Sequence, residues 1–467
     1  MYYPVLENIN KSIFRESDIR GLVARDLHPD TVEWIGKAIG TYVRRRGGKN
    51  ITVGRDVRES SFMFQESLTR GLLHTGCQVI DIGLVPTPAA YFSLYHLETD
   101  GGIMITGSHN PPEYNGFKIS YGRQNLFGCA IQELYRRIEQ FDFEVGAGQS
   151  TSTCILEAYK EKICDIISIS RPLKVVVDGG NGCFGLVGPD ILRRLGLNVV
   201  ELFCQPDGSF PNHHPDPTIL PNLRDLIQKV RDEKADLGIG FDGDADRIGV
   251  VDENGNVIWG DHILMILARD ILKRNPGATI IGEVKCSQYL FEDIRKRGGV
   301  PLMTATGHSL IKKKMRDTGA LLGGEMSGHF CFADNYFGFD DAIFAACRLL
   351  QVLADSPIPL SQILSDLPPS AYTPEIRIDC PDDRKFHIVR EITEYLRFRY
   401  NILEIDGLRV QFKDGWALLR ASNTQPALTL RFEASSWERL EEIQKIIYEP
   451  LSVFVPNLIA DRDIWRF

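Results

Sequence analysis

The chain has 467 residues, of which 43% are hydrophobic and 25% are charged, and its formal net charge at pH 7 is −9. This length predicts two to four domains, at roughly 100–200 residues per domain. The composition is ordinary and contains no low-complexity tract, which is typical of a globular chain with an ample core. The negative charge argues against a nucleic-acid-binding protein, which would normally carry a basic patch or stripe.

The sequence contains no signal for secretion or for a membrane. The ten cysteines are scattered between Cys77 and Cys380 without a C-x-x-C pair, which is typical of thiols in a reducing compartment. Residues 1–7 lack the basic and apolar parts of a signal peptide, and no apolar stretch reaches the roughly 18 residues of a membrane span. We therefore expect a cytoplasmic protein with no membrane partner.

The first part of the chain alternates a helix with short strands. A helix is expected over residues 30–46, because apolar side chains recur there at helical spacing and Gly47 can end it. Strands are expected at residues 50–54, 78–83 and 102–106, and each is followed by a loop. A small, polar stretch near residues 145–155 then suggests a boundary.

Two further units repeat this alternation. Six more strands are expected, at residues 173–177, 197–203, 236–241, 279–282, 300–304 and 319–323. Strands that alternate with helical stretches predict βαβ units and mostly parallel sheets. The fold class expected for these three units is therefore α/β.

The tail has a different pattern. Strands are expected at residues 375–379, 408–412, 416–420 and 427–432, with helices over residues 384–400 and from about Trp437. The last three strands look antiparallel, so this unit is expected to be α+β. The domains are therefore predicted at residues 1–150, 151–255, 256–368 and 369–467.

A serine loop follows the strand at residues 102–106. Pro111 and Pro112 lack the N–H donor that a strand ladder needs, so the chain must leave the sheet where Ser108 and His109 stand. Ligands of open α/β sheets bind beyond the carboxyl ends of the strands. The hydroxyl of Ser108 is therefore a candidate nucleophile.

Asp242, Asp244 and Asp246 form the sharpest local signal. If the segment is extended, its alternate residues face one side and the three carboxylates converge. Carboxyl groups that lie so close together cannot all stay ionised without a cation. A hard cation with oxygen ligands, Mg²⁺ by preference, fits this set, and the alternative is a solvated acidic turn.

Two arginine-containing segments could bind anions. Arg20 lies beside a glycine that leaves room for an anion, although a surface ion pair would look the same. Residues 420–424 supply one guanidinium and three short polar side chains at a strand end, which can form an anion nest or an ordinary turn. Lys118, Lys285 and His308 carry no signal by themselves.

Four motifs taken together resemble those of the α-D-phosphohexomutase superfamily, and the resemblance covers essentially the whole chain. Residues 106–112 resemble its phosphoserine loop and residues 242–247 its Mg²⁺ loop. Residues 324–329 resemble its sugar-binding loop and residues 420–424 its phosphate-binding loop. The bacterial phosphomannomutase/phosphoglucomutase branch is the most similar, through the sugar loop Glu-Met-Ser-Gly-His and the runs at residues 307–309 and 210–215.

The resemblance implies four domains around a central cleft. Three are related α/β domains with mixed, mostly parallel sheets, and the fourth is a smaller C-terminal α+β domain. It also implies a cytoplasmic, monomeric isomerase of carbohydrate metabolism and nucleotide-sugar biosynthesis. Its partners would be small hexose phosphates, with no nucleic acid and no membrane.

The implied reaction is a reversible phosphoryl transfer between O1 and O6 of mannose and glucose phosphates. It would pass through a phosphoserine at Ser108 and a hexose 1,6-bisphosphate. The implied metal is Mg²⁺, held by Ser108, Asp242, Asp244 and Asp246. Glucose 1,6-bisphosphate, or mannose 1,6-bisphosphate, would be the priming activator.

The resemblance also assigns roles to the remaining site residues. Catalytic roles fall on Arg20, Ser108, His109, Lys118, Arg247 and His329. Substrate binding falls on Lys285, His308, Glu325, Met326, Ser327, Gly328, His329, Arg420, Ser422, Asn423 and Thr424.

Ser17 departs from the pattern, because the family branch usually has tyrosine at this position. A serine cannot offer the apolar ring face that tyrosine presents to a sugar, so weaker substrate affinity is expected.

Three rival functions remain open. They are a phosphoglucosamine mutase, disfavoured by Met326, a sugar-phosphate-binding protein without catalysis, and a Mg²⁺-dependent phosphatase.

Overall fold

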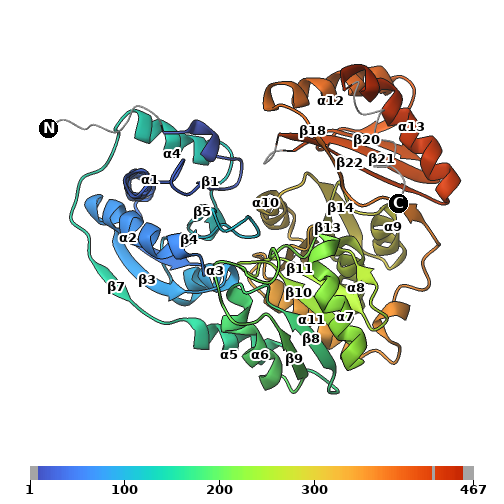
Figure 1. Cartoon of the computed structure of the whole chain (residues 1–467), viewed down its shortest axis with the longest axis horizontal. Coiled ribbons are helices and arrows are strands. Elements are labelled where there is room, and N and C mark those ends of the chain that lie inside the picture. Colours follow the sequence, from blue (N-terminus) through green and yellow to red (C-terminus); the bar gives the residue numbers. More distant parts are fainter. Residues whose placement is uncertain (1–8, 423–425, 456–467) are drawn as a thin grey trace.

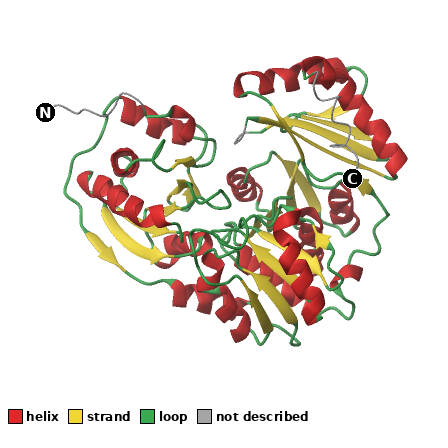
Figure 2. Ribbon diagram, viewed as in Figure 1, coloured by secondary structure: helices red, strands yellow, loops and turns green. Residues whose placement is uncertain are grey.

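The computed structural model describes residues 9–422 and 426–455. Four sheets follow one another along the chain, and we refer to the parts built on them as the first, second, third and fourth units. The first and fourth units flank the second and third (Figure 1). Helices pack against the sheets in every unit (Figure 2).

The first unit has the strand order β1-β5-β4-β2-β3-β7, with β6 beside β5. β4, β2, β3 and β7 run parallel, whereas β1 and β5 are antiparallel to their neighbours. Its strands are β1 (Ile19–Leu22), β2 (Asn50–Arg55), β3 (Gln78–Leu84), β4 (Gly101–Ile105), β5 (Tyr114–Tyr121), β6 (Gln124–Asn125) and β7 (Ser150–Ser152). Its helices are α1 (Pro29–Arg44), α2 (Glu59–His74), α3 (Thr87–His96) and α4 (Cys129–Glu139).

The second unit has the strand order β12-β11-β10-β8-β9, in which β10, β8 and β9 run parallel. Its strands are β8 (Lys174–Asp178), β9 (Asn198–Leu202), β10 (Leu237–Phe241), β11 (Ile248–Asp252) and β12 (Val257–Ile258). Its helices are α5 (Leu156–Ile166), α6 (Gly188–Arg194) and α7 (Arg224–Glu233).

The third unit has the strand order β14-β13-β15-β16, and only β16 is antiparallel to its neighbour. Its strands are β13 (Thr279–Glu283), β14 (Val300–Thr304), β15 (Leu322–Gly324) and β16 (Phe330–Phe332). Its helices are α8 (Gly260–Arg274), α9 (Gln288–Lys296), α10 (His308–Thr318) and α11 (Ala342–Ala354).

The fourth unit is an antiparallel sheet of order β17-β22-β21-β20-β19, with β18 also beside β22. Its strands are β17 (Ala371–Tyr372), β18 (Ile376–Asp379), β19 (Asn401–Leu403), β20 (Leu408–Phe412), β21 (Gly415–Ala421) and β22 (Ala427–Ala434). Its helices are α12 (Asp382–Arg397) and α13 (Trp437–Phe454).

The predicted fold class is confirmed, with three mixed, mostly parallel sheets followed by a smaller α+β unit. Element ends differ by a few residues, as for α1, which ends at Arg44 because Gly47 closes its terminus with a positive φ of 86°. The first sheet reaches Ser152 and the second Ile258, just beyond the domain limits expected at 150 and 255. Those limits stay predictions.

The three largest hydrophobic cores of the described chain follow the units. One core joins α3 to the second and third units, whereas the first and fourth units each have their own. In β4, Ile103 and Ile105 face the core of the first unit and Met104 faces the shared core, as the two-residue period of a strand requires. β4 thereby anchors the serine loop between two cores.

All ten cysteines are free thiols, as the sequence predicted. Among the helices of the described chain, none is long and apolar enough to cross a membrane.

Buried charges join the fourth unit to the third. Arg431 of β22 donates a 2.9 Å hydrogen bond to Asp261 of α8 and another to the carbonyl of Lys285. Glu433, two residues further along β22, accepts from the Ser287 hydroxyl at 2.6 Å and from the Gln288 N–H at 3.0 Å. These bonds fix the fourth unit beside the β13–α9 loop that carries Lys285.

Replacing Arg431 should destabilise the protein strongly. Arg431→Met leaves the fully buried Asp261 without its guanidinium, and removal of one partner of a buried ion pair costs about 3–5 kcal/mol. The matched control is Arg439→Met, which breaks the exposed Arg439–Asp414 pair and should cost about 0–1 kcal/mol. The free energy of unfolding in urea measures both, and equal losses would contradict the assignment.

Candidate active site

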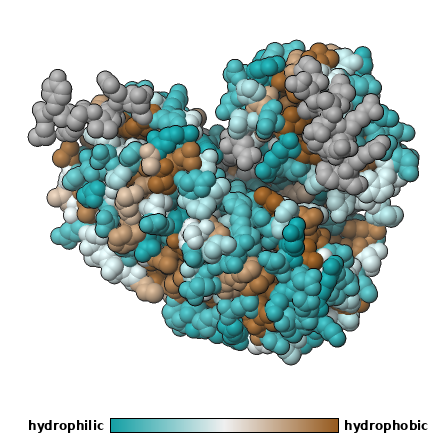
Figure 3. Space-filling model, in the orientation of Figure 1, coloured by the Kyte–Doolittle hydropathy of each residue, from teal (hydrophilic) through white to brown (hydrophobic). Residues whose placement is uncertain are grey.

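Loops from all four units line one cleft. On the face shown in Figure 3, the molecule is hollowed between the first and fourth units. The loops follow the carboxyl ends of β4, β10, β13, β14 and β15, the ends at which ligands of α/β sheets bind. The predicted site residues that line the cleft are Arg20, Ser108, His109, Lys118, Arg247, Lys285, His308, Glu325, Ser327, His329, Arg420 and Ser422.

Ser108 stands on a strained turn directly after β4. Its φ is +49°, a left-handed conformation that costs a residue with a side chain of order 1–3 kcal/mol. The Ser108 N–H donates to the Thr106 hydroxyl at 2.7 Å. The surroundings must therefore hold this turn in place.

Arg58 holds the serine loop from below. Its guanidinium donates to the carbonyls of Ser108 at 2.8 Å, Asn110 at 2.5 Å, Pro111 at 2.5 Å and Tyr114 at 3.0 Å. One fully buried cation thus satisfies four carbonyls, and its fixed donor geometry sets the shape of the loop.

Two further groups complete the support for Arg58. Asp56 pairs with the Arg58 Nε at 3.1 Å and accepts the Gly107 N–H at 3.1 Å. The ring of Phe210, from the second unit, lies with its centroid 5.1 Å from the guanidinium. The Phe-Pro-Asn-His-His run noted in the sequence therefore begins at a residue that covers the serine-loop clamp.

The Ser108 hydroxyl faces a carboxylate and an imidazole. Its Oγ donates to Asp242 Oδ2 at 2.9 Å and lies 3.2 Å from His109 Nδ1. Burial, with Arg247 and Arg20 nearby, holds the pKa of His109 well below its usual value, so the ring is neutral. The nucleophile predicted from the sequence thus lies at the base of the cleft beside two groups that can accept its proton.

The three aspartates converge, but not for the reason the sequence suggested. The segment is a turn rather than an extended strand, because Ala245 has a φ of +61° and Asp242 Oδ1 accepts the N–H groups of Asp246 and Arg247 at 3.0 and 3.1 Å. One carboxylate oxygen from each of Asp242, Asp244 and Asp246 lies within 4.8 Å of the others. The interpretation as an extended segment was wrong, while the convergence was right.

This carboxylate cluster, Asp242, Asp244 and Asp246, fits a hard divalent cation. All three side chains are fully buried. The Oδ1 atoms of Asp244 and Asp246 accept no hydrogen bond from the described residues. Buried carboxylate oxygens without a hydrogen-bond donor are costly, and carboxylate oxygens that lie close together match the ligands that Mg²⁺ prefers.

Lys118 contacts the same cluster from β5. Its ammonium donates to Asp244 Oδ2 at 2.6 Å and also to Asp246 Oδ2. Burial opposes the charge, but Asp244 and Asp246 raise the pKa of Lys118 well above its usual value. Lys118 is therefore a stable cation in this arrangement, suited to neutralise charge and to donate a proton rather than to accept one.

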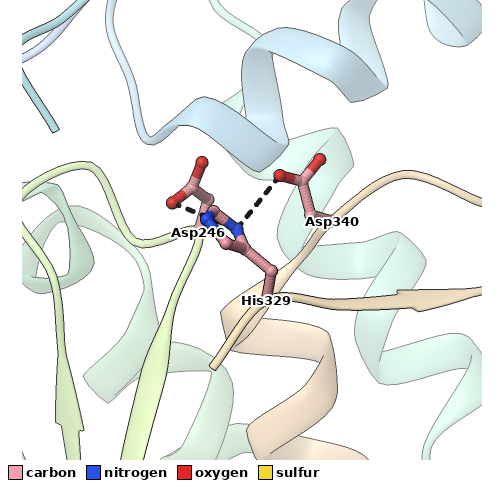
Figure 4. Close-up of side chains that lie close together, drawn as sticks. All are labelled: Asp246, His329 and Asp340. Atoms are coloured by element: carbon pink, nitrogen blue, oxygen red, sulfur yellow. Dashed lines mark ion pairs between the residues drawn. The ribbon is translucent and has the colours of Figure 1, made fainter. Parts of the chain in front are cut away.

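His329 lies between Asp246 and Asp340 (Figure 4). Its Nδ1 lies 3.6 Å from Asp246 Oδ1 and 3.2 Å from Asp340 Oδ2. Its Nε2 accepts a 2.8 Å hydrogen bond from Arg247 Nε, which places the ring proton on Nδ1. Asp340 and His329 thereby orient the guanidinium of Arg247 in the cleft.

The Asp340 carboxylate contacts several side chains. Its Oδ2 lies 2.9 Å from His308 Nδ1, and its Oδ1 accepts from Lys312 Nζ at 2.6 Å. The rings of His308 and His329 are stacked, with centroids 5.1 Å apart. Asp246, His329 and Asp340 form a second group that could hold a metal ion. Because Asp340 is already surrounded by cationic and imidazole groups, the all-oxygen carboxylate cluster is the better Mg²⁺ site.

The sugar loop presents only some of its predicted residues to the cleft. Glu325 accepts the Gly307 N–H at 2.9 Å and the Ser327 hydroxyl at 2.7 Å, and both acidic and hydroxyl groups line the cleft. Met326 and Gly328 are not among the lining residues. Gly328 has a φ of +89°, and a Cβ there would lie 2.2 Å from the Ile248 carbonyl, so this glycine allows close packing on β11.

The third and fourth units supply further cations to the cleft. Arg420 Nε pairs with Asp406 Oδ2 at 2.9 Å, and the same oxygen accepts the Thr306 N–H of the third unit at 3.0 Å. Lys285 Nζ lies 2.9 Å from Glu375 Oε2. Ser422 lines the cleft, whereas the predicted Asn423 and Thr424 lie outside the described residues.

Arg20 has a fixed position at the opposite wall. Its guanidinium donates to the Gly107 carbonyl at 3.1 Å, to Asn110 Oδ1 at 2.6 Å and to Asp18 Oδ2 at 2.6 Å. Arg20 therefore binds the serine loop, and the surface ion pair considered from the sequence accounts for only one of its contacts.

Several functional positions were missed in the sequence. Asp216, Glu375 and Arg377 line the cleft, and Arg58 and Asp340 support lining residues. A weak signal existed for Arg58, since Asp56 and Arg58 follow a strand end directly. Asp340 had none, because its partners lie elsewhere in the chain.

Four family models match the chain in order. They describe phosphoglucomutase/phosphomannomutase α/β/α domain I at residues 11–144, domain II at 156–255, domain III at 259–371 and the C-terminal domain at 375–449. The chain belongs to the phosphoglucomutase/phosphomannomutase family. The resemblance to the α-D-phosphohexomutase superfamily is thereby confirmed.

Relatives of this family member match nearly its whole length. A phosphomannomutase/phosphoglucomutase of Pseudomonas aeruginosa is 48% identical over 448 residues, which cover 96% of this chain and 97% of that protein. A phosphoglucomutase of Neisseria gonorrhoeae is 44% identical over 444 residues, covering 94% and 96%. The crystal structure of a phosphoglucomutase/phosphomannomutase family protein from Burkholderia thailandensis has a TM-score of 0.91 at 43% identity, covering 96% and 99%.

Asp340 provides a test of the positioning network in this family member. Asp340→Asn should lower kcat by about tenfold to a hundredfold with a smaller change in KM, because supporting residues of this kind orient reacting groups without touching the substrate. Asp340→Glu, which keeps the charge, should retain more activity. Steady-state kinetics with hexose phosphates measure both.

The matched control is Asp317→Asn on the exposed end of α10, where Asp317 pairs with Lys313. It should leave kcat and KM unchanged. An Asp340→Asn variant that is folded and fully active would remove Asp340 from the network.

Proposed function

We propose that this enzyme moves a phosphoryl group reversibly between O1 and O6 of mannose and glucose phosphates, through a phosphoserine at Ser108 and a hexose 1,6-bisphosphate. Its membership of the family makes it a phosphomutase. The observation that carries the proposed route is the Ser108 hydroxyl, which lies against the carboxylate cluster at the base of a cationic cleft. Glucose 1,6-bisphosphate, or mannose 1,6-bisphosphate, would load the serine.

In the forward step, the P–O bond to Ser108 breaks while a P–O bond to the free sugar hydroxyl forms. The sugar hydroxyl loses its proton, and the Ser108 oxygen gains one or pairs with a cation. Such a transition state asks the protein mainly for positioning and for neutralisation of charge. Lys118, held as a cation, is suited to the Ser108 side of the transfer.

His329 is the other candidate for moving the hydroxyl proton. The lone pair of its Nε2 accepts a hydrogen bond from the Nε–H group of Arg247. Arg247 would stabilise the phosphoryl oxygens once it turns from His329 toward the substrate, which frees Nε2 to accept the proton. Arg20 would stabilise the same charge from the opposite wall, and His109 would assist beside Ser108.

Asp242, Asp244 and Asp246 would hold Mg²⁺ together with the Ser108 oxygen or its phosphate. When bound there, Mg²⁺ supplies positive charge to the phosphoryl oxygens. The buried Oδ1 atoms of Asp244 and Asp246, which accept no hydrogen bond from the described residues, support this assignment.

The far side of the cleft would bind the sugar and the phosphate that does not react. Glu325 and Ser327 would hold the hydroxyls at positions 3 and 4, near the middle of the ring, so the same pair can serve both orientations of the bisphosphate. Lys285 and His308 would also contact the substrate. Arg420 and Ser422, with Asn423 and Thr424, would grip the distal phosphate.

Phosphorus NMR distinguishes the proposed reaction from its rivals. The protein is mixed with mannose 1-phosphate, Mg²⁺ and a trace of glucose 1,6-bisphosphate, with glucose 1-phosphate and glucosamine 1-phosphate run in parallel. Conversion of the mannose and glucose compounds to 6-phosphates, lost on chelation of the metal, supports the proposal. Conversion of the glucosamine compound alone, release of free phosphate, or no change would each contradict it.

Ser108→Ala should abolish turnover because it removes the oxygen that carries the phosphoryl group. Binding of sugar phosphates should stay measurable by calorimetry, since the other cleft groups remain. Ser365→Ala, at an exposed serine, is the control and should be fully active. Substantial mutase activity in Ser108→Ala would overturn the nucleophile assignment.

Ser17→Tyr should tighten substrate binding. Ser17 lines the cleft, so a tyrosine there can place its ring against the sugar, and such a contact is worth about 0.5–1.5 kcal/mol, or about twofold to tenfold in KM. Steady-state kinetics would show a lower KM for glucose 1-phosphate, whereas Ser17→Ala should leave KM unchanged. An unchanged or higher KM in Ser17→Tyr would show that position 17 does not contact the sugar.

A further inference from the structure

A second concave site lies between the first and third units. Its volume is about 650 Å³, within the range of small-molecule sites. Its walls come from α3, the β5–β6 turn, α10 and the loop after β16. Among the described residues, it shares no lining residue with the active-site cleft.

Aromatic rings form much of this interdomain pocket. The centroids of Tyr95 and Phe337 lie 4.5 Å apart, and Phe337 and Phe339 are nearly parallel with centroids 5.7 Å apart. The guanidinium of Arg123 lies 4.6 Å from the centroid of Tyr95. These surfaces suit a flat ring, which can stack on the aromatic side chains or on the guanidinium.

The charges of the interdomain pocket all have one sign. Arg123 and Arg316 are exposed at its rim and Lys312 is buried at its base, and no described lining residue is acidic. Within the described chain, neither Arg123 nor Arg316 forms an ion pair. In a chain with a net charge of −9, such a basic pocket attracts an anion, and each of its two planar guanidinium groups can donate paired hydrogen bonds to two oxygens of a phosphate.

The base of the interdomain pocket is connected to the active site. Lys312 lies 4.4 Å from the ring centroid of Tyr91 and donates a 2.6 Å hydrogen bond to Asp340. Asp340 in turn lies 2.9 Å from His308 and 3.2 Å from His329. A ligand that draws Lys312 toward an anionic group would change the support of both imidazoles. The pocket also spans two units, since the Tyr95 hydroxyl donates to the Phe337 carbonyl at 3.1 Å.

We propose that the interdomain pocket is a regulatory site for an aromatic anion of the nucleotide class. Its ring packs on Tyr95, Phe337 and Phe339, and its phosphates pair with Arg123 and Arg316. Its binding changes the turnover of the mutase through Lys312 and Asp340. Such a ligand needs both parts. Its ring covers the aromatic side chains of the pocket, and its phosphates pair with the guanidinium groups.

Calorimetry with adenosine 5′-diphosphate as the probe tests the binding. The full-length protein is used in buffer with a chelator, so that a metal cannot recruit the phosphates to the active site. The nucleotide should bind, while adenosine and pyrophosphate should each bind at least about tenfold more weakly, a difference of about 1.4 kcal/mol. Equal binding of pyrophosphate would mean a plain anion site and would contradict the proposal.

A double variant locates the binding. Arg123→Ala with Arg316→Ala should weaken binding of the nucleotide at least about tenfold and leave the activity without nucleotide unchanged. Lys313→Ala with Lys314→Ala is the matched control, because it removes the same charge from residues of α10 that do not line the interdomain pocket. Binding that is unaffected by the first pair, or absent in the unmodified protein, would overturn the proposal.

Kinetics in Mg²⁺ test the connection to the active site. The nucleotide should change kcat without competing with the hexose phosphate, and the Arg123→Ala, Arg316→Ala variant should not respond. Purely competitive inhibition would place the nucleotide in the active-site cleft. Binding that leaves kcat unchanged would overturn the regulatory role.

Discussion

The active site depends on the need to compensate three carboxylates buried at the junction of the first and second units. Asp242, Asp244 and Asp246 are fully buried, and an isolated ionised carboxylate in such a place would cost several kcal/mol. The first unit supplies the compensating groups, the ammonium of Lys118 and the hydroxyl of Ser108. The electrostatic requirement of one unit thus positions the proposed nucleophile of another, and the same cluster is suited to a metal ion.

Arg20 and Arg420 are fixed in the cleft before any substrate arrives. Arg20 is bound by the serine loop and Arg420 by Asp406. Cations held in this way can stabilise phosphate charge without reorganising during the reaction, which is where most of the benefit of electrostatic catalysis lies. The four units therefore act as a frame that holds basic groups around one serine hydroxyl.

The sequence was sufficient for the architecture and for the positions of the loops. Alternating apolar runs predicted the strands, and Pro111 and Pro112 predicted where β4 ends, because local chemistry decides both. The shape of the Asp242–Arg247 turn was not predictable, since it rests on a left-handed Ala245. The roles of Arg58 and Asp340 were missed because each acts on residues distant in the chain, and no local pattern marks such contacts.

Peptide mapping by mass spectrometry tests the central claim most directly. The protein is incubated with glucose 1,6-bisphosphate and Mg²⁺, digested and analysed, and a second sample receives an excess of glucose 1-phosphate with an ¹⁸O-labelled phosphate before digestion. We predict one phosphate, on Ser108, which becomes ¹⁸O-labelled in the second sample because the bisphosphate returns the phosphoryl group of the substrate to the serine. A phosphate on another residue, or mutase activity with Ser108 never phosphorylated, would contradict this prediction.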